Sequence, residues 1–140
     1  MSYATAEDLA KRIAQDELIR LTDEADTGVV NDATVDAALE SADVEIDSYL
    51  AARYTLPLAS GQPLLASLAV DIAIWNLYSL DASGVPENRK ERYQAAVKTL
   101  ERLSSGKQTL GGEETAAASG SAVVMSSPER LFSRTSLKDM

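Results

Sequence analysis

Apolar residues recur every three or four positions along most of the first hundred residues, the spacing that places them on one face of a helix. The clearest such helix starts at Asn31 and Asp32, two good capping residues. Its apolar positions are Val35, Leu39, Ala42, Ile46, Tyr49 and Leu50. The acids between them are Asp36, Glu40, Asp43, Glu45 and Asp47. We therefore expect an amphipathic helix whose acids face away from the core.

Two shorter segments are expected before this helix. Thr5 with Asp8 forms a capping arrangement that predicts the start of the first one. The apolar stripe then shifts phase near Gln15 and Asp16. A break into a short second helix is expected there.

The next helix is apolar nearly all round. Pro57 ends the acidic helix, because proline lacks an N–H and restricts the residue before it. Pro63 suits an early position of a new helix over about residues 63–80. A helix without a polar face is normally central in its bundle. Its Asp71 needs a partner, because an unpaired buried carboxylate is costly. We expect Arg53, which closes the preceding helix, to be that partner.

The last predicted helix begins at Pro86 and ends before Gly106. It is the one net-basic element, since five bases meet three acids within residues 86–102. No convincing strand is found in the first hundred residues. The predicted fold class is therefore all-α, a compact bundle of four to five helices spanning residues 1–105.

A change of composition marks residues 106–140 as a second unit, an extended and partly flexible C-terminal arm. Residues 106–127 are rich in Gly, Ser, Thr and Ala, which is typical of a flexible linker. Residues 127–140 carry apolar and basic side chains in a polar frame, which favours a segment that orders on binding a partner. A frayed terminus is the alternative. The residues assigned to partner docking are Arg130, Leu131, Phe132, Arg134 and Leu137.

The net charge of −9 lies entirely in the predicted bundle. Residues 1–105 hold nine Lys or Arg and 18 Asp or Glu, and residues 16–48 hold eleven acids against Arg20. Such a surface repels nucleic acid, so specific DNA binding is not expected. Two interpretations of the acidic surface remain open: it keeps the protein soluble, or it complements basic residues on another subunit.

Catalysis, metal binding and cofactor binding are not expected. The chain has no cysteine and no histidine, which removes disulfides, thiol chemistry, structural zinc and imidazole acid–base catalysis. A calcium loop started at Asp23 lacks acids at its later ligand positions. Asp43 and Asp47 lie one turn apart, on what we expect to be the exposed side, without a cleft to shift their pKa. Trp75 and Tyr78 are expected to be core residues.

Neither a leader nor a membrane span is expected. The first residues are charged within one turn and lack the apolar region of a signal peptide. No apolar run approaches the roughly 20 residues of a membrane helix. The cytoplasm is therefore the expected compartment, with no membrane partner.

Five motifs, in their order along the chain, resemble a known family. They are Y-x-T-x-x-D-L, I-D-S-Y-L-A-A-R-Y-x-L-P-L, L-A-V-D-I-A-I-W-N-L-Y, P-E-x-x-x-x-R-Y-x-x-A-V-x-x-L and S-R-x-S-L-K, at residues 3–9, 46–58, 68–78, 86–100 and 133–138. The order resembles small virion neck proteins of Mu-like phages and prophages, over essentially the whole chain. The second motif is the most specific. Trp75 departs from the family's usual aromatic, and the linker before the last motif has a free composition.

The resemblance implies a helical bundle with an extended arm that acts as a head–tail connector, or adaptor. Such proteins form a ring, dodecameric in related systems, under the portal protein of the filled capsid in the host cytoplasm. In the virion neck, the ring extends the DNA channel without binding DNA specifically. It also provides the platform for the downstream neck or tail-completion protein. No enzyme activity and no cofactor are implied.

A ring requires two different contact faces on each subunit, because its head-to-tail contacts are heterologous. We expect the acidic flank of one copy to meet the basic helix of the next, with apolar surface at the proline corner adding stability. The residues assigned to this subunit interface are Arg53, Tyr54, Leu56, Leu58, Arg89, Lys90 and Arg92. The competing interpretation is a small helical regulatory or antitoxin-like module that binds one protein partner.

Overall fold

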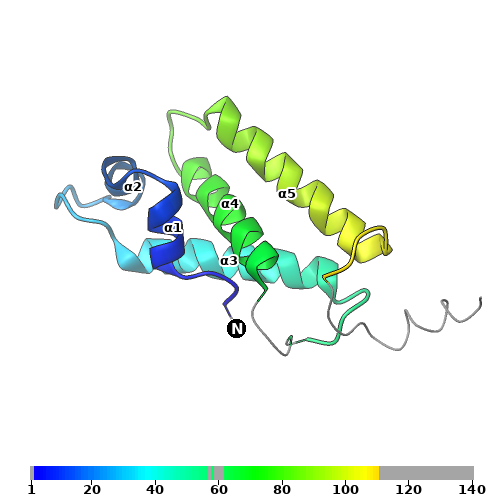
Figure 1. Cartoon of the computed structure of the whole chain (residues 1–140). Helices are drawn as coiled ribbons and strands as arrows, with labels where there is room; N and C mark the ends of the chain where they lie inside the picture. The colour runs from blue at the N-terminus through cyan, green and yellow to red at the C-terminus, as the bar shows by residue number, and fades with distance from the viewer. Residues whose placement is uncertain (1, 57, 59–61, 111–140) are drawn as a thin grey trace, which may run out of the picture.

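The computed structural model describes residues 2–56, 58 and 62–110 (Figure 1). Within these residues the chain forms five helices and no strand: α1 (Ala6–Arg12), α2 (Gln15–Thr22), α3 (Asp32–Leu50), α4 (Pro63–Ser79) and α5 (Glu87–Ser105). The predicted all-α bundle is confirmed. The five residues assigned to the docking arm lie outside the described residues, so the arm and its domain boundary stay predictions.

Local capping fixes the start of α1. The Thr5 hydroxyl accepts the backbone N–H of Asp8 at 3.2 Å, and the Asp8 carboxylate accepts the backbone N–H of Thr5 at 3.0 Å. This reciprocal arrangement satisfies two N–H groups that the first helical turn leaves unbonded. Ile13 and Ala14 are both extended, which separates α1 from α2 where the phase shift predicted a break.

The acidic helix α3 begins as its capping signal predicts. The side-chain oxygen of Asn31 accepts the backbone N–H groups of Ala33 and Thr34 at 3.1 and 3.4 Å. The predicted apolar stripe turns inward, with Tyr49 half-buried and its other members buried. The buried hydrophobic residues of the helix are Val35, Ala38, Leu39, Ala42, Ile46 and Leu50.

The apolar helix α4 is the centre of the bundle, as its lack of a polar face predicts. It contacts each of the other four helices (Figure 1). Its buried hydrophobic residues are Leu65, Leu68, Ala69, Val70, Ile72, Ala73, Ile74, Leu77 and Tyr78. Fully burying one large aliphatic side chain stabilises a fold by about 1.5–3 kcal/mol, so the surface of α4 is a major source of stability.

The C-terminal ends of α3 and α5 meet at one end of the bundle. Gly106 closes α5 with a φ of 87°, a left-handed conformation that glycine adopts without a steric penalty. The guanidinium of Arg53 occupies the space that a Cβ on Gly106 would need. Beyond the helix, the backbone N–H of Leu110 donates to the Tyr54 hydroxyl at 3.1 Å. The chain therefore leaves the described bundle beside the corner that follows α3.

Candidate interaction surfaces

The single acid of the central helix is held by arginines from two other helices. Asp71 projects from α4, and its side chain is only 10 % exposed. Its Oδ1 accepts a hydrogen bond at 2.7 Å from the Arg12 guanidinium of α1, and Arg92 of α5 reaches the same oxygen at 3.4 Å. One carboxylate thus joins three helices.

The predicted Arg53–Asp71 pair is therefore wrong. Arg53 follows the C-terminal end of α3 and lies against Gly106, whereas Asp71 sits at mid-helix on α4. The prediction failed because it considered only the helix adjacent in sequence. The folded bundle instead brings α1 and α5 to the side of α4 that carries Asp71.

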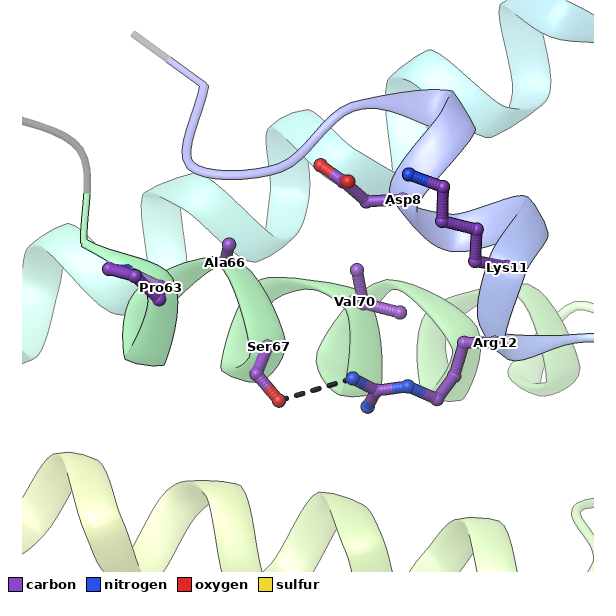
Figure 2. Close-up of a pocket in the computed structure, with 7 residues that line it drawn as sticks. All are labelled: Asp8, Lys11, Arg12, Pro63, Ala66, Ser67 and Val70. Atoms are coloured by element: carbon purple, nitrogen blue, oxygen red, sulfur yellow. Dashed lines mark hydrogen bonds between the residues drawn. The ribbon is translucent and has the colours of Figure 1, made fainter.

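Arg89 adds a third guanidinium to this junction. It donates to the backbone carbonyl of Arg12 at 3.4 Å, at the end of α1 where the helix dipole favours cations. Arg12 also donates to the Ser67 hydroxyl at 3.2 Å (Figure 2). Beside these contacts lies a groove of about 290 Å³ between α1 and α4. We call Lys11, Arg12, Arg89 and Arg92 the basic cluster.

The predicted interface residues have different positions in the protomer. Of the four basic ones, Arg89 and Arg92 make contacts inside the junction, Arg53 lies against Gly106, and Lys90 is exposed. Tyr54 is only 3 % exposed and packs in the core of the protomer, and its assignment to the subunit interface stays a prediction. Leu56 and Leu58 are half-buried against the same core and stay interface predictions.

Lys11 and Arg12 belong to the basic cluster, but the sequence did not predict this. The prediction of a basic surface used only the helix α5, because five bases lie within it. A signal was nevertheless present: Lys11-Arg12 is the only adjacent basic pair in the first 50 residues of a very acidic stretch. Nothing in that signal indicates that the pair would lie beside α5.

The N-terminal segment covers part of the acidic side of α3. The backbone N–H of Tyr3 donates to Asp43 at 3.0 Å, and the Tyr3 hydroxyl donates to Asp47. Asp43 is only 7 % exposed, so the prediction that it faces solvent is wrong. Burial raises the pKa of Asp43 above its ordinary value, because charge is less stable out of water. Burial, reinforced by the bond to Asp47, likewise raises the pKa of the Tyr3 hydroxyl.

Two further exposed acids of α3 lie on the same flank, nearer its N-terminal end. Asp36 and Glu40 are exposed and border a groove of about 330 Å³ beside the first residues of α1. We call these two residues the acidic flank. The exposed residues of α3 also include uncharged ones, namely Ala33, Ala37, Ser41, Val44 and Ser48.

The two aromatic residues considered on α4 differ in burial. Tyr78 is 3 % exposed, which confirms it as a core residue, and its hydroxyl donates to Glu17 at 2.8 Å. Trp75 is only half-buried and stacks on Tyr93 of α5, with ring centroids 4.5 Å apart. The Tyr93 hydroxyl donates to Glu45 at 3.2 Å, so this stack ties α4, α5 and α3 together.

Asp23 stabilises the loop that follows α2. Its carboxylate accepts the backbone N–H groups of Thr27 and Gly28 at 2.8 and 2.6 Å, and these bonds lower its pKa. Among the residues that the structure describes, no group of three or more acids is arranged to hold a metal ion. The same described part of the chain contains no helix long and apolar enough to cross a membrane.

These features define the class of protein: a small all-helical bundle that carries a basic cluster and an acidic flank on separate surfaces. The comparison with known families is specific. The model of the family "Bacteriophage Mu, Gp36" matches residues 3–127, and the chain belongs to this family.

Two phage-encoded relatives align over most of the chain. "Gene product J" of Escherichia phage Mu is 37 % identical over 120 residues, which are 85 % of this chain and 83 % of the relative. "Mu-like prophage FluMu protein gp36" of Haemophilus influenzae is 32 % identical over 109 residues, 78 % of this chain and 75 % of the relative. The predicted family is thereby confirmed.

Proposed function

We propose that the protein is a structural virion protein, a head–tail connector subunit that assembles into a ring under the portal. The main support is membership of the phage Mu Gp36 family over residues 3–127. In this proposal the ring is dodecameric and lies in the virion neck. The portal protein lies above it, and a downstream neck or tail-completion protein lies below.

The surface of the bundle is compatible with ring assembly. Copies related by rotation meet through two different patches, and a rotation that closes produces a ring. The basic cluster and the acidic flank are two such patches of opposite charge. An excess of acids would also keep DNA from adhering to the wall of a channel, because it repels phosphates.

Electron microscopy of the purified chain, together with light scattering over a wide concentration range, tests the proposal. We expect closed rings of uniform diameter at high concentration and low ionic strength. A small dimer whose mass does not change with concentration would instead support a regulatory or antitoxin-like module. That outcome would overturn the connector function.

The C-terminal arm is proposed to attach the ring to its neighbours in the neck. The motif at residues 133–138 and its apolar and basic surroundings support this assignment. A chain that lacks residues 127–140 should still form rings but fail to bind portal-containing capsids in a co-sedimentation assay. Normal capsid binding by the shortened chain would contradict a docking role.

A further inference from the structure

We propose that the basic cluster of one copy receives the acidic flank of α3 from a second copy of this chain. The inference rests on the proposed ring function and specifies the two surfaces that meet between neighbouring subunits. It differs from the expectation drawn from sequence, in which α5 alone supplied the basic face.

The basic cluster has an excess of positive charge. Arg12 and Arg92 meet at Asp71, Arg89 reaches the end of α1, and Lys11 lies with Asp8 on the rim of the adjoining groove. Asp71 accepts from both Arg12 and Arg92, and one carboxylate neutralises only one guanidinium. In a chain of net charge −9, this junction is therefore a local site of attraction for further carboxylates.

The shape of the junction suits a helix flank. The groove between α1 and α4 has an apolar floor that includes Ala66 and Val70, with Lys11 and Arg12 on its rim (Figure 2). Arg12 is 30 % exposed and Arg92 is 52 % exposed, so both guanidiniums keep donors within reach of an incoming group. An apolar floor with a charged rim is the usual anatomy of a protein–protein contact.

The acidic flank offers the complementary chemistry. Asp36 and Glu40 are one helical turn apart, so their side chains are neighbours on the surface of α3. Neither forms an ion pair with any residue in the described ranges 2–56, 58 and 62–110. Asp43 and Asp47, farther along the same flank, are already bonded to Tyr3.

One copy can use both surfaces at the same time. The groove beside the basic cluster is lined on its α1 side by Asp8, Lys11 and Arg12. The groove beside the acidic flank is lined instead by Thr5 and Ala6. The two grooves share no lining residue, and in this proposal each copy binds one neighbour through each of them. Repetition of such a heterologous contact produces a ring where the rotation between copies closes.

Two exposed charge reversals test the pairing without disturbing Asp71. One variant is Lys11→Glu, and the other combines Asp36→Lys with Glu40→Lys. Each should weaken self-association about tenfold or more in sedimentation velocity at low ionic strength, because each places like charges together. The matched control combines Lys98→Glu with Glu101→Lys, exposed positions on α5 that belong to neither surface, and it should associate as the wild type does. Circular dichroism checks that every variant remains helical.

An equimolar mixture of the two variants gives the decisive measurement. Each variant alone has one damaged surface, but the mixture contains an intact basic cluster on one protein and an intact acidic flank on the other. The mixture should therefore recover pairwise association that neither variant has alone.

The pairing would be overturned if both variants associate as strongly as the wild type, or if their mixture stays monomeric. It would also be overturned if the wild-type chain never self-associates. Charge-dependent association that yields only open chains in electron microscopy would overturn the ring function and leave the pairing intact.

Discussion

Asp71 and Asp43 are two carboxylates on neighbouring helices that the bundle accommodates in opposite ways. Asp71 on α4 receives two guanidiniums, from Arg12 and Arg92. Asp43 on α3 receives one backbone N–H, from Tyr3, and lies one turn from Asp47. The first site joins three helices by charge, whereas the second attaches the N-terminal segment by hydrogen bonds.

The difference has an electrostatic consequence. Around Asp71 the cations outnumber the acids, so the region remains positive and can attract another subunit. Asp43 has the like charge of Asp47 one turn away, and burial raises the pKa of Asp43. The part of α3 under the N-terminal segment is therefore a structural attachment, and the exposed pair beyond it is the one that we propose to meet a second copy.

The largest effect is expected from Asp71→Ala. This change leaves two guanidiniums without their carboxylate, and removing one side of a buried ion pair is costly. Because both arginines remain partly exposed to solvent, the free energy of unfolding should fall by only about 2 kcal/mol. Urea denaturation measures the change. Glu101→Ala, at an exposed position on α5, is the control and should change stability by less than about 0.5 kcal/mol. Equal losses in the two variants would show that Asp71 does not join the helices.

A smaller loss is expected from Tyr3→Phe. This change removes the hydroxyl that donates to Asp47 and keeps the ring, so about 1 kcal/mol of stability should be lost. Hydrogen exchange at the first residues should increase as the segment opens more often. Tyr49→Phe serves as the control, because its hydroxyl has no bonded partner within the described part of the chain. No change in exchange at the N-terminal segment would contradict an attachment through Tyr3.

The smallest effect, and one of opposite sign, is expected from Asp43→Asn. Because the folded-state pKa of Asp43 is raised, the folded protein holds this proton more tightly than the unfolded chain does. The contribution of Asp43 to stability is therefore greatest at low pH and is lost as the pH rises from its ordinary pKa through the raised value. Asparagine keeps an acceptor for Tyr3 and carries no charge.

Urea denaturation at several pH values measures this effect. The stability difference, variant minus wild type, should be near zero below about pH 4 and should become positive toward neutral pH. All other carboxyl groups are common to the two proteins, so the pH-dependent part of the difference reports Asp43. A difference that does not change with pH would contradict the buried state of this side chain.

Most of the fold could be predicted because its signals are local. The capping pairs at Thr5 and Asn31, the proline at position 63 and the glycine at position 106 act within a few residues of the chain. The apolar surface of α4 likewise indicates a central helix without any knowledge of its neighbours. The motifs that carry the family resemblance are also sequence properties.

The interaction surfaces were predicted less well, because they depend on which helices meet. Arg53 was chosen as the partner of Asp71 from proximity in sequence, whereas Arg12 and Arg92 are separated from it by 59 and 21 positions. The assignment of Asp43 to the exposed side followed from helical periodicity alone. Periodicity cannot indicate that an N-terminal segment will cover part of that side.

The sequence by itself determined an all-α bundle of four to five helices, the central position of α4, the excess of acids and the membership in a phage Mu family. Capping, periodicity and total charge are properties of neighbouring residues or of composition, so they can be read without a fold. Only the tertiary structure decided that cations from α1 and α5 surround Asp71 and that Tyr3 bonds to Asp43 and Asp47. Ion pairing and desolvation act through space, so they depend on how the helices pack.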